Sequence, residues 1–203
     1  MSIIESDVSD VALRRAMSDA ARGDHTALGC LLDTVDNDKL LLVLGKVRAA
    51  LDASSQTPAE SLRVAGLLAD RLAELPDPAH LMFSPRDLAI YILADVLTRT
   101  GAQVGDKQVD DLLSRIESKL LRLHVWSRVW AAMKTVRSSE PQQWFTTINR
   151  RMADEAVVDF INNLRGGDSA PTDDGVGSSL HFALTRMFHE SGDGDRVDGA
   201  VVV

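Results

Sequence analysis

The chain has 203 residues, a formal net charge of −8 at pH 7, and 45% hydrophobic but only 4% aromatic residues. This composition excludes a disordered chain, and the length suits one domain with at most a small appendage. The single cysteine, Cys30, excludes a disulfide framework and any multi-cysteine zinc module. We find no secretory signal and no apolar run near the roughly 20 residues that span a bilayer, so we expect a cytoplasmic protein without a membrane partner.

Helix signals follow one another along the first part of the chain, whereas alternating strand patterns are scarce. Capping residues and the spacing of leucines predict helices from Ser9 or Asp10 to Arg22, through 27–32, and from Asp36 or Asn37 to Leu51. Gly23 is a suitable residue for ending the first of them. These short, closely spaced elements favour a helical bundle.

Two four-residue motifs mark helix starts most clearly. Thr57-Pro58-Ala59-Glu60 places a capping threonine before a proline and puts a carboxylate three residues after the cap. Ser84-Pro85-Arg86-Asp87 repeats this arrangement. The first helix must stop before Pro76, because proline cannot continue it. The second, expected over 85–100, is apolar on nearly every side, which predicts a central core helix.

The second half of the chain predicts fewer and longer helices. Residues 106–137 contain no proline or glycine, so they form either one helix or two helices broken near His124. Glu140-Pro141 starts another helix, which ends at Arg165. We therefore expect an all-α, multi-helix bundle of about seven to eight helices with short loops and a flexible C-terminal tail. The expected divisions are a bundle domain at 1–166, a flexible linker at 167–178, a short helix at 179–190 and a disordered tail at 191–203, and we detect no internal period of 20–50 residues.

The segment 112–151 is basic and aromatic, unlike the rest of the chain. It holds all three tryptophans and a net charge of +6, which leaves −14 on the remaining residues. Clustered aromatic side chains in such a segment serve either as core or as anchors at a subunit or partner interface. The residues expected to act as interface anchors are Trp126, Trp130, Trp144 and Phe145.

Two alternatives remain for the basic residues of this segment. They form a solvated face paired with the acidic remainder of the chain, or they contact the phosphates of a nucleic acid while the aromatic rings stack on bases. The residues expected to bind RNA or DNA in the second case are Arg115, Lys119, Arg122, Arg150 and Arg151. A helical projection places Arg128 far from this group, and the negative net charge disfavours a polyanionic partner.

Motifs for catalysis are weak throughout the sequence. The five histidines lack metal-ligand spacing, the glycines at 175 and 177 lack the lysine of a phosphate loop, and Cys30 among apolar neighbours favours a buried, unreactive thiol. We therefore expect neither an enzyme nor a cofactor or metal. The leading hypothesis is a non-enzymatic helical interaction or assembly protein that binds a protein partner or itself as a homo-oligomer. The alternative is an accessory nucleic-acid-binding protein.

Overall fold

The computed structural model describes the backbone of residues 10–53, 56–77, 83–135 and 143–165. Within these ranges the secondary structure is helical and contains no strand, which confirms the all-α bundle. The eight helices there are α1 (Asp10–Ala21), α2 (Thr26–Thr34), α3 (Asn37–Ala53), α4 (Pro58–Arg71), α5 (Pro85–Val104), α6 (Asp106–Ser114), α7 (Lys119–Thr135) and α8 (Gln143–Arg165). The linker, short helix and tail expected at 167–203 lie outside the described residues.

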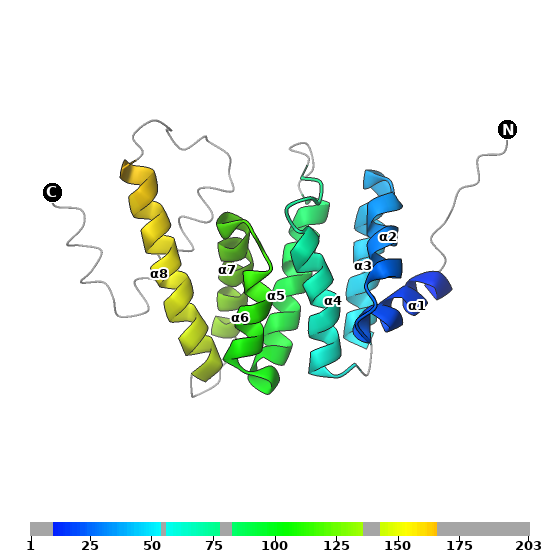
Figure 1. The fold of residues 1–203 in the computed structure, drawn as a ribbon, viewed down its shortest axis with the longest axis horizontal. Coiled ribbons are helices and arrows are strands. Elements are labelled where there is room, and N and C mark those ends of the chain that lie inside the picture. The colour runs from blue at the N-terminus through cyan, green and yellow to red at the C-terminus, as the bar shows by residue number, and fades with distance from the viewer. Residues whose placement is uncertain (1–9, 54–55, 78–82, 136–142, 166–203) are drawn as a thin grey trace.

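The helices stand in a row, with α1 at one end and α8 at the other (Figure 1). They form two layers. Helix α5 packs between α3 and α7 in one layer, whereas α4 packs on α1 and α6, and α6 on α8, in the other. The layers meet where α4 and α6 pack against α5 and where α7 packs against α8. The bundle is therefore an open stack rather than a ring of helices around one axis.

Helix α5 is the centre of this stack, as its apolar sequence predicts. It packs against α3, α4, α6, α7 and α8, and most of its apolar side chains are buried. Leu93 and Leu97 are fully buried, as is Leu68 of α4, the helix that packs along α5. Burial of a side chain of this kind contributes about 1.5–3 kcal/mol relative to exposure, so the contacts of α5 supply much of the stabilisation.

Both predicted helix starts are confirmed in atomic detail. The Thr57 hydroxyl accepts a hydrogen bond from the Glu60 amide, and the Glu60 carboxylate accepts one from the Thr57 amide at 2.7 Å. The bond from the Thr57 amide, together with one that the Thr57 hydroxyl donates to the same carboxylate, lowers the pKa of Glu60. The Ser84–Asp87 pair makes the same two bonds at the start of α5. Each capping box satisfies amide groups that have no partner within the helix.

Two expected helix boundaries are wrong. Gly101 does not end α5, which continues to Val104 and stops at Gly105, whose φ of +84° suits glycine. The break in 106–137 falls at 115–118, one to two turns before His124. At this break the Arg122 side chain donates to the Ile116 carbonyl, and the Ser118 hydroxyl accepts from the Leu121 amide. These side-chain bonds replace helical ones and allow the chain to turn.

Across the part of the chain that the structure describes, no helix combines the length and the apolar character needed to cross a membrane.

Candidate interaction surface

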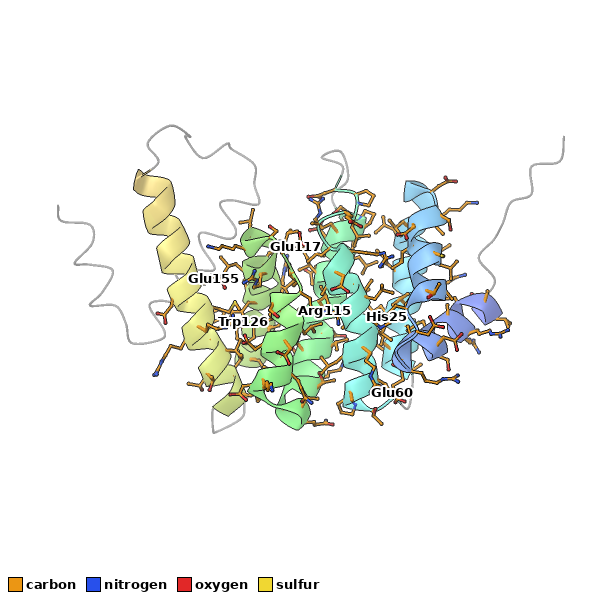
Figure 2. The ribbon with its side chains drawn as sticks, viewed as in Figure 1. His25, Glu60, Arg115, Glu117, Trp126 and Glu155 are labelled. Carbon is orange, nitrogen blue, oxygen red and sulfur yellow. The ribbon has the colours of Figure 1, made fainter. Side chains whose placement is uncertain are left out.

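Trp126 lies inside the chain, where α7 meets α8 (Figure 2), and Trp130 and Trp144 are buried as well. Trp126 of α7 is fully buried and stacks on Phe145 at a centroid distance of 5.4 Å, while Trp144 meets it edge-on at 6.4 Å. The Trp126 indole N–H donates to Oδ1 of Asn149 in α8 at 3.1 Å. This cluster fastens α8 to the stack.

The sequence left two roles open for these aromatic residues, core or interface anchor, and their buried position matches the core. Trp126, Trp130 and Trp144 each keep less than a tenth of their surface exposed, and only Phe145 is partly exposed. A side chain that is already buried in its own chain has little area left for a partner. In this conformation the expected anchors therefore offer a partner no more than the edge of Phe145.

Three of the five basic residues expected at a nucleic acid are neutralised by carboxylates of neighbouring helices. Arg122 and Glu155 pair at 2.8 Å with only 15% and 16% of their side chains exposed. Arg115 pairs with Asp70, and Arg151 with Asp110. The other two expected residues, Lys119 and Arg150, are exposed. Arg115 and Arg151 therefore match the alternative of a solvated face paired with the acidic remainder, and Arg122 is paired but mostly buried.

Two of these pairs belong to a series that connects consecutive helices of one layer. Asp33 of α2 pairs with Arg71 of α4, and the adjacent Asp70 pairs with Arg115, which follows α6. The third pair joins Asp110 of α6 to Arg151 of α8. We call this series the Asp–Arg ladder. Each pair contributes about 0–1 kcal/mol, because its charges are partly solvated.

Glycines make room for the first two pairs of the Asp–Arg ladder. A Cβ atom on Gly29 would lie 2.8 Å from the Arg71 guanidinium, and one on Gly66 would lie 2.5 Å from that of Arg115. Each glycine stands four residues before the aspartate of its pair, so both pairs share a Gly-x-x-x-Asp motif. Sequence reasoning missed this short repeat, which was too brief to define a period.

A different set of residues forms the most distinctive exposed feature, at the junction of α5 and α7. The Arg128 guanidinium carbon lies 4.5 Å above the centroid of the Tyr91 ring, and its Nη1 donates to the Tyr91 hydroxyl at 2.8 Å. The Phe83 ring, 41% exposed, packs beside Tyr91 at 5.6 Å. We call Phe83, Tyr91 and Arg128 the Tyr91 cluster.

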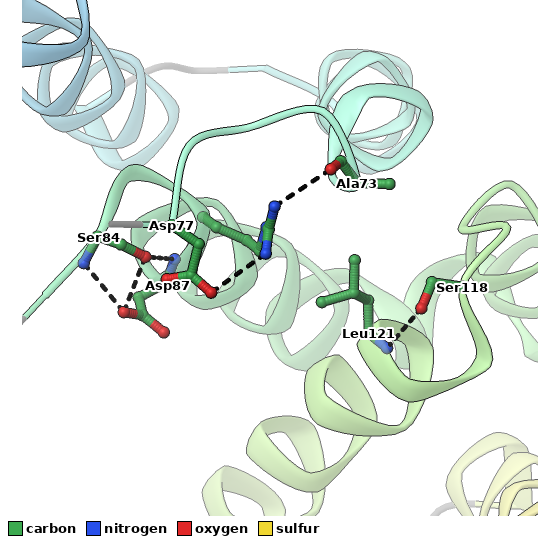
Figure 3. A network of polar contacts seen from close by, with 7 residues as sticks. Ala73, Asp77, Ser84, Asp87, Ser118 and Leu121 are labelled. Atoms are coloured by element: carbon green, nitrogen blue, oxygen red, sulfur yellow. Dashed lines mark hydrogen bonds and ion pairs between the residues drawn. The ribbon is translucent and has the colours of Figure 1, made fainter. Parts of the chain in front are cut away.

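Polar contacts hold the backbone at the start of α5, next to this cluster in the sequence (Figure 3). The Ser84–Asp87 capping box sets the start of α5, directly after Phe83. Arg86 donates to the Asp77 carboxylate at 3.1 Å and to the Ala73 carbonyl at 3.2 Å, which ties the start of α5 to residues 73 and 77. The position of Phe83 is therefore determined by α5 and not by a free loop.

His124 lies one turn before Arg128 on α7 and is partly buried. Burial lowers its pKa, the positive charge of Arg128 lowers it further, and the carboxylates of Asp87 and Asp77 oppose this change. The imidazole is therefore neutral at pH 7, and Arg128 is the cation of this surface.

Stability is expected to fall on acidification because of His124. Its pKa is lower in the folded chain than in the unfolded chain, where it is about 6.5, so the unfolded chain binds the proton first as pH falls. Thermal unfolding followed by circular dichroism between pH 7.5 and 5.5 should show a smaller loss for His124→Gln than for the wild type. His25→Gln, which alters the start of α2, is the control. Parallel profiles for the wild type and His124→Gln would contradict this assignment.

No group of three His, Cys, Asp or Glu side chains within the described residues is arranged to hold a metal ion. Cys30 is exposed, so its expected burial is wrong. The reason is that Leu28, Gly29 and Leu32 form the buried face of α2, from which Cys30 points away. Comparison of the chain with protein-family models, curated proteins and solved structures finds no match.

Proposed function

We propose that this chain is a non-enzymatic helical interaction protein that binds a protein partner or a second copy of itself through an exposed face of the stack. The Tyr91 cluster carries this proposal. It combines an exposed phenyl ring, a tyrosine and an arginine, and aromatic residues and arginine dominate the residues that contribute most to protein–protein binding. Because α5 and α7 hold its backbone, a partner meets a surface that is already ordered.

In this proposal the Tyr91 cluster, and not the tryptophans, contacts the partner. An interface anchor needs exposed area before binding, which Phe83 has and Trp126 lacks. A nucleic-acid partner has less support, because Arg115, Arg122 and Arg151 already have carboxylate partners. Breaking such a pair to bind a phosphate would leave an unpaired carboxylate beside a polyanion.

The test is association of the full chain, by sedimentation velocity over a concentration series and by capture of proteins on the immobilised chain. We expect a second copy or another protein to bind, and Phe83→Ser to weaken that binding. Leu120→Ser is the matched control, because Leu120 is also a large exposed apolar residue, at 51%, but lies outside the cluster.

Binding that Phe83→Ser weakens and Leu120→Ser leaves unchanged supports the proposal. The proposal is overturned if the chain sediments as a monomer at every concentration and Phe83→Ser captures the same proteins as the wild type, or if both variants weaken binding equally.

A further inference from the structure

An aromatic ring holds Arg128, whereas carboxylates hold many arginines of the stack. Within the described residues, several arginines pair with a carboxylate: Arg71, Arg86, Arg99, Arg115, Arg122 and Arg151. The partner of Arg128 is the ring and hydroxyl of Tyr91, and no ion pair of Arg128 occurs in the same part of the structure. No carboxylate among the described residues therefore neutralises its charge.

The Tyr91 contact also orders the Arg128 side chain. A guanidinium has five N–H donors in a planar fork, and the Tyr91 hydroxyl accepts from one nitrogen, Nη1. The ring beneath the guanidinium carbon limits the rotation of an exposed side chain. An ordered guanidinium with free donors suits a carboxylate, which accepts two of its N–H groups at once.

Phe83 adds an apolar contact beside this cation. Its ring packs against the Tyr91 ring and is 41% exposed, so a ligand that reaches Arg128 also meets a phenyl surface. A carboxylate alone would leave this surface in water. The better match is an acidic residue with a large apolar residue next to it in the same extended segment.

From this arrangement we infer that the Tyr91 cluster recognises a short acidic peptide segment of a protein partner, with Asp or Glu at Arg128 and an adjacent aromatic or large aliphatic side chain on Phe83. The inference rests on the proposed interaction function and specifies the chemistry of its partner. A single carboxylate is favoured over a nucleic acid because the cluster offers one guanidinium, whereas a row of phosphates is bound by several cations at once.

The test uses three dipeptide probes with blocked ends: acetyl-Asp-Phe-amide, acetyl-Asn-Phe-amide and acetyl-Asp-Ala-amide. Each is titrated into the full ¹⁵N-labelled chain, and the Arg128 Nε–H and the backbone amides of α5 and α7 are followed by NMR. The Asp-Phe probe is expected to bind about tenfold more tightly than either of the others, because each of those lacks one of the two contacts.

Variants assign each preference to its residue. Arg128→Gln should abolish the preference for Asp over Asn, and Phe83→Ala should abolish the preference for Phe over Ala. Arg128→Lys keeps the charge without the planar fork and should retain only part of the first preference. Leu120→Ala should bind all three probes as the wild type does, and unfolding curves verify that every variant is folded.

Equal affinity for the Asp-Phe and Asn-Phe probes, or shifts confined to other helices, would overturn the inference while leaving an association function standing. Displacement of the Asp-Phe probe by a single-stranded oligonucleotide would assign the surface to nucleic acid instead. If the Asp-Phe probe binds more tightly only after Phe182 or Phe188 is replaced by alanine, the Tyr91 cluster binds the chain's own 179–190 segment. Either result also counts against a partner peptide.

Discussion

Trp126→Ala is expected to lower the free energy of unfolding by about 3–5 kcal/mol, the usual cost of removing a large buried aromatic side chain. Trp126 is fully buried, stacks on Phe145 and meets Trp144 edge-on. Its removal leaves a cavity between α7 and α8 and deprives the Asn149 side chain of its hydrogen-bond donor. The loss therefore combines missing contacts with an unsatisfied polar group.

Urea unfolding followed by circular dichroism measures this loss. Trp126→Phe should cost less, because it keeps a ring against Phe145 and removes only the larger part of the indole. Leu120→Ala, at an exposed position of the same helix, should change stability by less than about 0.5 kcal/mol. A change below about 1 kcal/mol for Trp126→Ala would contradict the core position of this residue.

Gly101→Ala is expected to destabilise the chain, although alanine favours helices more than glycine by about 1 kcal/mol. A Cβ atom on Gly101 would lie 2.5 Å from Cη2 of Trp144, well inside contact distance. The Trp144 indole cannot move aside easily, because it is packed against Trp126 and Phe145. Overpacking of this kind costs about 1–3 kcal/mol, which exceeds the gain in helix propensity.

Gly45→Ala gives the opposite result in the same experiment. Gly45 also lies within a helix, α3, but a Cβ atom there would meet nothing within 4 Å. This variant should therefore be more stable than the wild type by about 0.5–1 kcal/mol. Thermal unfolding of the two variants gives shifts of opposite sign if the contact between Gly101 and Trp144 is as described. Stabilisation by Gly101→Ala would rule that contact out.

Local signals in the sequence predicted local structure correctly. The capping boxes at Thr57 and Ser84 involve bonds between residues three apart, so the sequence contains every participant. The all-round apolar pattern of 85–100 likewise predicted a central helix. The expected end at residue 100 was wrong because Gly101 lies within α5, where it admits a close neighbour, Trp144, that is distant in the sequence.

The candidate site was less predictable for the same reason. Helical spacing of Trp126 and Trp130 fits a core and an interface equally, because both require an apolar stripe. The Tyr91 cluster joins residues from the start of α5 and the middle of α7, so its geometry depends on how these helices pack. The only tyrosine of the chain and an arginine apart from the other basic residues were the available signals.

The Asp–Arg ladder has a consequence for how such a chain can grow. Asp70 and Arg71 are adjacent on α4, so this one helix supplies the carboxylate for the helix after it and the guanidinium for the helix before it. An inserted duplicate of 58–104 would carry both halves of the connection, so each aspartate and arginine of the Asp–Arg ladder would still have a partner. Because stacked arrays are stabilised mainly by nearest-neighbour contacts, lengthening this protein by such a unit should cost little folding stability.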